Sequence, residues 1–145
     1  MLKWQWTATI LSLLLVACFT DGALSAMASN NSALANGKAI FQTGIDLQGT
    51  HITSRPPALM PKCAACHFAD GHGGLHLPGG AVSADLRHRA LVTTQKQPYT
   101  LALLERAIST GIDNKGQPLN RVMPHWQLSK TDLHDVAQYV LTSLK

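Results

Sequence analysis

The sequence predicts an all-α domain, because three of its segments carry the residue pattern of helices. The clearest is the last segment, where apolar residues between Leu133 and Leu144 recur at the spacing of a single helix face. A second segment, residues 99–110, has the same period and stops at Gly111, and a third begins near Asn36. Glycine and proline are concentrated between these segments, where they favour turns. The expected architecture is therefore a few helices joined by irregular loops.

Length and charge narrow the classes of function. The chain has 145 residues, which is the size of one domain, and its formal net charge is +4. It contains no run of lysine and arginine, so we predict no nucleic-acid site. The first quarter reads as a targeting segment and a tether, which leaves about 110 residues to fold. A domain of that size buries only a modest core, and a large apolar cofactor would substitute for the missing side chains.

The N-terminus has the layout of a secretory signal peptide at residues 1–17. Lys3 precedes an apolar run, residues 7–17, that is too short to span a bilayer comfortably. The run ends in Leu15-Val16-Ala17-Cys18, which resembles the lipobox of bacterial lipoproteins. This resemblance implies export, a lipid on Cys18 and a place on the periplasmic side of a bacterial membrane. The alternatives are an ordinary signal that is cleaved further on, with Cys18 discarded, and a retained membrane helix.

Residues 18–35 are expected to form a flexible tether between the lipid and the folded domain, residues 36–145. The tether consists largely of alanine, serine, asparagine and glycine and has no sustained apolar period. Regular structure is expected to begin near Asn36, a plausible helix N-cap. Gly37 and Phe41 then lie four residues apart on one face, which is typical of a close contact between helices.

The most specific motif is the pentapeptide Cys63-Ala64-Ala65-Cys66-His67. Its two thiols stand one helical turn apart, so each can add to one of two neighbouring haem vinyl groups while His67 reaches the iron. A zinc site would need about two further ligands, and no cysteine is left downstream to provide them. A redox dithiol normally opens a helix after a strand, and no strand run precedes Lys62. Covalent haem on Cys63 and Cys66 is the favoured interpretation, with zinc and dithiol chemistry as alternatives.

The segments after the pentapeptide are expected to enclose a flat ligand. Residues 71–80 are dense in glycine, which lets the backbone lie close to such a ligand. The helix at residues 99–110 presents a core face, and the last helix starts at Ser129-x-x-Asp132, which resembles a capping box. The stripe of the last helix that must be buried consists of Leu133, Val136, Ala137, Val140, Leu141 and Leu144.

Four features in this order resemble a class I c-type cytochrome: Gly37-x-x-x-Phe41, the pentapeptide, Met123-Pro124 and the amphipathic final helix. The resemblance covers essentially the whole mature domain. It implies a small cytochrome c fold of three to five helices around one covalently bound haem c. The N- and C-terminal helices are expected to cross, so that Val136 and Tyr139 meet Gly37 and Phe41.

The resemblance also implies the iron ligands and the activity. His67 and Met123 would fill the two axial positions, which leaves no open position for a substrate. The protein would then be an electron carrier and not an enzyme, shuttling single electrons between redox partners such as an exported dehydrogenase, a respiratory complex or a terminal reductase. The alternative is a haem enzyme or gas sensor in which the sixth ligand is labile. A structural zinc-binding module is a third hypothesis.

Further positions are candidates to support the haem by the same resemblance. The second ring nitrogen of His67 is expected to donate to a backbone carbonyl, with Pro78 as the candidate. Arg87 or Arg89 is a candidate to pair with a haem propionate. Trp126 is expected either to lie near the haem, donating its indole N–H to a propionate, or simply to pack in the core.

Residues 45–61 depart from the pattern of the smaller family members, which have only a few residues between the first helix and the haem motif. Arg55-Pro56-Pro57 and Pro61 block helix formation in this stretch. We expect a surface loop that wraps one haem edge. Partner recognition and an insertion without a role are both open interpretations.

Overall fold

The structure is a computed structural model that describes residues 6–58 and 60–145, with side chains from residue 25 onward apart from residue 59. Its contacts divide the chain into a unit that ends at Ser32 and a unit from Ala33 to Lys145. The predicted signal peptide 1–17 and the predicted lipid attachment residue Cys18 lie where no side chain is described. Within the described residues, no helix combines the length and the apolarity needed to cross a membrane.

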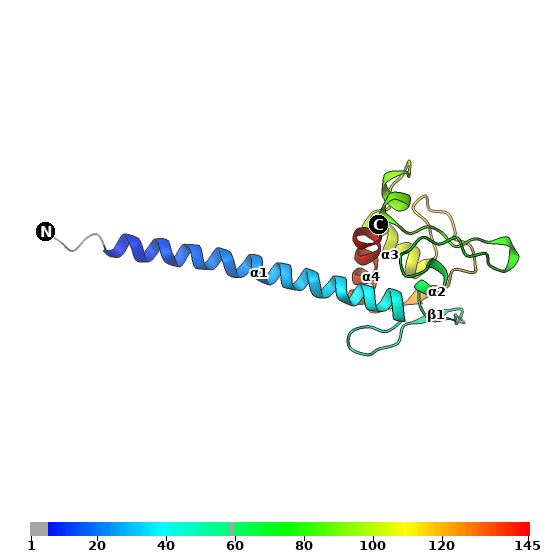
Figure 1. Ribbon diagram of the computed structural model, residues 1–145, viewed down its shortest axis with the longest axis horizontal. Coiled ribbons are helices and arrows are strands. Elements are labelled where there is room, and N and C mark those ends of the chain that lie inside the picture. Colours follow the sequence, from blue (N-terminus) through cyan, green and yellow to red (C-terminus); the bar gives the residue numbers. More distant parts are fainter. Residues whose placement is uncertain (1–5, 59) are drawn as a thin grey trace. The chain divides into compact units, whose positions relative to one another are not determined.

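The unit from Ala33 onward is mostly helical, as predicted, with one small sheet (Figure 1). Its elements are the C-terminal part of α1 (Trp6–Thr43), β1 (Thr53–Arg55), α2 (Ala64–His67), a 3-10 turn (Pro78–Gly80), a π-helical turn (Arg89–Thr93), α3 (Leu101–Thr110), β2 (His125–Gln127) and α4 (Lys130–Ser143). β1 and β2 are antiparallel, with Thr53 opposite Gln127 and Arg55 opposite His125. The sequence did not predict this sheet or the π-helical turn.

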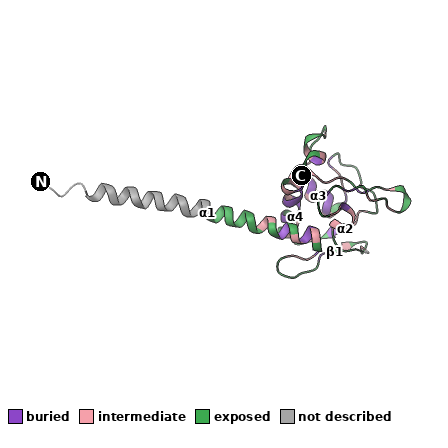
Figure 2. Cartoon of the chain, in the orientation of Figure 1, coloured by how far each residue is buried: buried purple, intermediate pink, exposed green. Residues whose placement is uncertain are grey.

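The expectation that regular structure begins near Asn36 is wrong, because α1 begins at Trp6 and includes the predicted tether, residues 18–35. The residues before Asn36 include many alanines and no proline, so nothing in them stops a helix. Asn36 is not an N-cap. Its side-chain amide donates to Asp132 and Asp135 at 2.9 Å each, and its oxygen accepts the N–H of Leu47 at 2.9 Å. Among the side chains of α1 that the structure describes, the buried ones begin at Asn36, in the C-terminal part of the helix (Figure 2).

α1 and α4 cross at a small residue, as predicted. A Cβ added to Gly37 would lie 2.1 Å from the backbone oxygen of Asp135 and 2.8 Å from the Cβ of Tyr139, so only glycine permits this approach. One turn further, the rings of Phe41 and Tyr139 are 5.7 Å apart between centroids and tilted by 54°. Both rings are buried, and a tilted aromatic pair of this kind adds to the stabilisation from buried apolar area.

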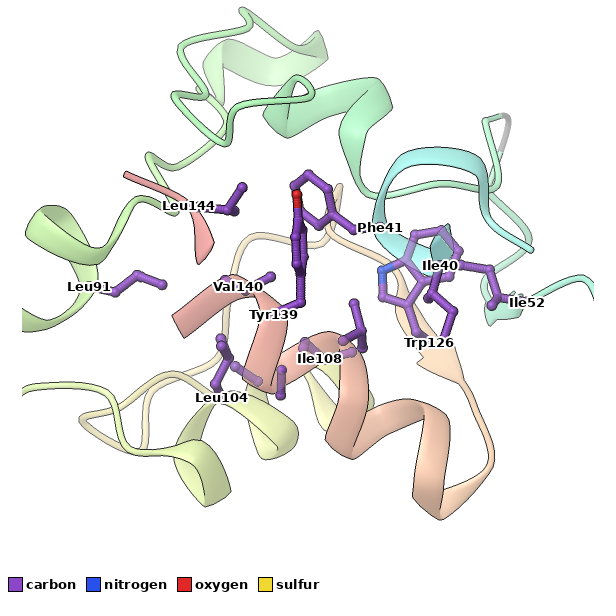
Figure 3. Packing of buried hydrophobic residues seen from close by; sticks show 13 residues of the cluster. Ile40, Phe41, Ile52, Leu91, Leu104, Ile108, Trp126, Tyr139, Val140 and Leu144 are labelled. Atoms are coloured by element: carbon purple, nitrogen blue, oxygen red, sulfur yellow. The ribbon is translucent and has the colours of Figure 1, made fainter. Parts of the chain in front are cut away.

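The remaining helices pack on this crossing to form one core (Figure 3). The Thr100 side chain caps α3 by accepting from the Leu103 N–H at 3.3 Å, and Gly111 ends α3 with a φ of 70°. Ser129 caps α4 by accepting the Asp132 N–H at 3.1 Å, which confirms the predicted start. The buried hydrophobic side chains are Ile40, Phe41, Ile52, Leu91, Leu104, Ala107, Ile108, Trp126, Val136, Ala137, Tyr139, Val140 and Leu144.

The 45–61 loop is more than a surface loop. Its Ile52 side chain is buried in the core, and its residues Thr53–Arg55 form β1. The loop also returns to its origin, since a Cβ on Gly44 would lie 1.8 Å from the carbonyl oxygen of Pro61. The prolines do exclude helix from this stretch, as expected, but they do not exclude a short strand that ends before Pro56.

Candidate functional site

The pentapeptide forms the short helix α2, with Cys63 at its N-cap. The N–H groups of Cys66 and His67 both donate to the Cys63 carbonyl, at 3.2 and 3.0 Å. This turn sets the two cysteines one helical turn apart, as the covalent chemistry requires. Both cysteines are free and half-buried. Phe68 then takes a positive φ of 60° with a ψ of 166°, which is not helical and ends α2 directly after His67.

His67 is buried and held by a single backbone acceptor. Its Nδ1 lies 2.8 Å from the carbonyl oxygen of Ala84. Because a carbonyl can only accept, Nδ1 carries the proton and the Nε2 lone pair is left for another partner. Burial lowers the pKa of His67 below its ordinary value, only partly offset by the bond to Ala84. The side chain is therefore a neutral, oriented imidazole, which is the form that binds a metal.

The carbonyl that orients His67 belongs to Ala84 and not to Pro78, so that prediction is wrong. Residues 74–83 form a hairpin, in which the Gly74 N–H donates to Ser83 at 2.8 Å and the Leu77 N–H donates to Ala81 at 2.8 Å. Pro78 lies at the tip of this hairpin and Ala84 at its base. The pairing register decides which carbonyl faces the imidazole, and register is a property of the folded chain.

Ser83 fastens the hairpin to α2, and the sequence did not indicate it. Its hydroxyl donates to the Cys66 carbonyl at 2.8 Å and accepts the Leu75 N–H at 2.9 Å. The Gly73 N–H also donates to the His67 carbonyl at 3.2 Å. Ser83 is buried, so these bonds are shielded from water. No residue pattern distinguishes such a serine from an ordinary loop serine.

The chemistry of Cys63 argues against a redox dithiol. Burial raises the pKa of its thiol to about 12, and the neighbouring Cys66 adds to the effect. A redox-active dithiol depends on the opposite shift, because the thiolate is the reactive form. A zinc site finds no support either, since no group of three histidine, cysteine or acidic side chains placed to hold a metal occurs in the described part of the chain.

Met123 lies on a separate segment from α2. Its N–H donates to the Asn120 carbonyl at 2.9 Å, and β2 begins two residues later at His125. Its side chain is half-buried against the hydrophobic core, whereas Arg121 and Val122 beside it are exposed. The structure thus groups Cys63, Cys66 and His67 on one turn and holds Met123 at the edge of the core.

Trp126 offers a buried donor of the kind that a haem carboxylate would use. Its ring is 4% exposed, and its Nε1 has no hydrogen-bond partner among the described residues. A buried donor without a partner is costly, so this nitrogen fits a site for an acceptor supplied from outside the chain. Together with the free thiols and the oriented imidazole, this donor means that the residues present suit a covalently attached haem.

Arg87 already has a partner within the chain. Its guanidinium contacts the Asp85 carboxylate at 2.6 Å and holds the pKa of that carboxyl below its ordinary range. Arg89 is exposed. His72, which lies near His67 in the sequence, is also exposed. Its Nδ1 lies 2.6 Å from Asp70 and its ring stacks on Phe68.

Comparison with known proteins gives one match. The family model described as Cytochrome c matches residues 34–144. Neither the curated proteins nor the solved structures provide a significant match. The matched range includes the α1–α4 crossing, α2 and the segment that carries Met123.

Proposed function

This chain belongs to the cytochrome c family, and from that premise we propose that it is an electron carrier whose haem iron is ligated by His67 and Met123. Members of the family carry haem c covalently, typically one per domain, and here Cys63 and Cys66 are the attachment residues. Haem-based electron transfer with other redox proteins is what membership in the family supports. The attachment residues, the ligand pair, the partners and the location are our proposals.

The observation that carries the proposal is the state of His67. Its Nδ1–H donates to Ala84 and its burial lowers its pKa, so the ring presents a neutral Nε2 without having to lose a proton first. Ser83 holds the Ala84 segment against α2 through the Cys66 carbonyl. The two cysteines and the imidazole are thus fixed relative to one another by backbone and serine hydrogen bonds.

Met123 supplies the second ligand in this proposal. Its thioether is a soft, neutral group, and pairing it with a neutral imidazole favours the ferrous state more than two nitrogen ligands would. When bound, the haem supplies an iron that takes up and releases one electron. Trp126 offers its buried Nε1–H to a carboxylate, and the unpartnered state of that donor supports this role.

We further propose that the protein is exported and held by a lipid on Cys18 at the periplasmic side of a bacterial membrane, with residues 18–35 as the tether. This rests on the apolar run before Cys18 and on the lipobox-like residues Leu15-Val16-Ala17. The proposed partners are an exported dehydrogenase, a respiratory complex or a terminal reductase. Mass spectrometry of the mature N-terminus tests the anchor, and a mature chain that starts after Cys18 without lipid contradicts it.

The ligand assignment is tested by absorption spectra of the oxidised and reduced protein, made in a host that matures c-type cytochromes. Wild type is compared with Met123→Ala, with and without carbon monoxide. We expect covalent haem in both proteins, a sulfur-to-iron charge-transfer band in wild type alone, and carbon monoxide binding that is rapid in the variant and slow in wild type. Met60→Ala is the matched control, because Met60 is exposed. A wild type without the band that binds carbon monoxide readily would instead favour catalysis or gas sensing.

A further inference from the structure

The 45–61 loop is joined to the segment that carries Met123. β1, which lies within the loop, pairs along its length with β2, and β2 begins two residues after Met123. Thr53, Ser54 and Arg55 lie opposite Gln127, Trp126 and His125 in turn. The chain between them in sequence contains α2 and α3, so this pairing is a purely tertiary contact.

The loop is itself anchored to the end of α1 at two points, Ile52 and Pro61. The Ile52 N–H donates to the Gly44 carbonyl at 2.9 Å, and Pro61 returns to lie against Gly44. Successive amide groups of a strand point to opposite sides, so with the Ile52 amide turned to Gly44 the Thr53 amide is turned to β2. Ile52 is also buried, and Figure 3 shows its side chain gathered with those of Ile40 and Trp126. Movement of β1 would therefore disturb the core.

The segment before Met123 is held at Leu119, whose N–H donates to the Gly111 carbonyl at 2.7 Å. Asn120, Arg121 and Val122 are exposed, and the Met123 N–H donates to a nearby residue of the same segment, Asn120. At the start of β2, the His125 imidazole covers Gly111, since a Cβ there would lie 2.3 Å from its Nε2. β2 thus contacts both the end of α3 and β1. The 45–61 loop provides the second of these two contacts, because it contains β1.

We infer that the 45–61 loop is a strap that positions Met123 by holding β2, with Thr53 and Ile52 as its positioning residues. This inference rests on the proposed ligation by Met123. A thioether on a flexible, unbranched side chain is a weak ligand, so its occupancy depends on how firmly its backbone is held. Loosening the strap raises the fraction of molecules in which Met123 is displaced, without touching α2.

Two pairs of variants test the strap. Thr53→Pro removes the amide that faces β2, whereas Thr53→Val keeps that amide and the preference for a strand. Ile52→Ala removes the buried anchor, whereas Leu47→Ala shortens an exposed apolar side chain of the same loop. All four proteins are made in a host that attaches haem, and covalent haem with native far-ultraviolet circular dichroism is required of each.

The measurements report on the Met123 ligand itself. We expect Thr53→Pro and Ile52→Ala to bind carbon monoxide about fivefold faster than wild type, as loss of one net hydrogen bond or anchor implies, with a weaker sulfur-to-iron band. Thr53→Val and Leu47→Ala should match wild type. In the Met123→Ala background, Thr53→Pro should no longer change the carbon monoxide rate, because the strap acts through Met123.

The outcomes separate this inference from the proposed function. If wild type lacks the sulfur-to-iron band, both fail. If wild type has the band but folded Thr53→Pro keeps it and binds carbon monoxide at the wild-type rate, the strap is overturned and the ligation stands. If Thr53→Pro does not fold, Ile52→Ala against Leu47→Ala decides in the same way. An equal acceleration by Thr53→Pro in the Met123→Ala background would also overturn the strap.

Discussion

At the scale of single residues, the site depends on which polar groups are satisfied by the chain and which are not. The His67 Nδ1 is bonded to Ala84 and the Ser83 hydroxyl is bonded twice, whereas the Trp126 Nε1 has no partner among the described residues. A buried polar group that has a hydrogen-bond partner holds the local geometry, whereas a buried polar group that lacks one is a candidate to bind a ligand. The bonded groups lie next to α2, and the unbonded indole nitrogen of Trp126 lies in β2. The proposed function uses both.

Ser83→Ala is predicted to loosen the hairpin from α2. It removes a buried hydroxyl that donates to Cys66 and accepts from Leu75, and it leaves those two backbone groups unpaired. We expect a loss of about 1–3 kcal/mol in the free energy of unfolding, measured by denaturant titration of the haem protein. Ser109→Ala is the control, because its hydroxyl only bonds back to Glu105 within α3. Equal stability of the two variants would contradict the role given to Ser83.

At the scale of elements, the crossing of α1 and α4 sets the frame on which the other helices pack. The close approach at Gly37 is reinforced by the Asn36 amide, which donates to Asp132 and Asp135 of α4. Asp135 is buried, so its carboxylate depends on this donor. The crossing thus combines a steric fit, a polar contact and the Phe41–Tyr139 ring pair within two turns of each helix.

Gly37→Val is predicted to disrupt this crossing. Even the first added carbon would lie 2.1 Å from the Asp135 oxygen, so the helices must separate, and α1–α4 packing is lost with them. We expect destabilisation of about 3 kcal/mol or more, which a thermal melt of the haem protein detects as a large fall in Tm. Ala35→Val, at an exposed position of the same helix, controls for helix propensity. An unchanged melting temperature for Gly37→Val would argue against the observed crossing.

At the scale of the whole molecule, the folded unit is small and its core is modest. The fully buried large side chains are Phe41, Ile40 and Val136, all at the α1–α4 crossing. Regions away from the crossing, such as the hairpin at residues 74–83, are held mostly by hydrogen bonds. A covalently attached apolar cofactor would add the contacts that these loops lack.

Removal of the haem is therefore predicted to lower the stability of the folded unit and to loosen its tertiary packing. In the double variant Cys63→Ala/Cys66→Ala, we expect a lower Tm, loss of near-ultraviolet circular dichroism and partial loss of helix signal, because a group that binds only the native state no longer stabilises it. The single variant His76→Ala, at an exposed position of the nearby loop, should melt like wild type. A double variant that melts cooperatively at the wild-type Tm would show that the protein core suffices alone.

The sequence by itself determined the features that depend on local chemistry. The helical class, the caps at Ser129 and Gly111, the buried stripe of α4 and the spacing of Cys63, Cys66 and His67 all follow from residues close together in the chain. Such features are readable because periodicity, capping and motif spacing act within one or two turns. The meeting of Gly37 with Tyr139 was also predicted, but through the family resemblance.

Only the tertiary structure decided the features that depend on how distant segments meet. His67 bonds to Ala84 and not to Pro78, and the Asn36 amide bonds to Asp132 and Asp135 and does not cap a helix. β1 pairs with β2, although the two are far apart in the sequence. Hairpin register, buried polar pairs and strand pairing between remote segments leave no periodic trace in the sequence. Their free energy comes from contacts that exist only after the chain has folded, so no local pattern encodes them.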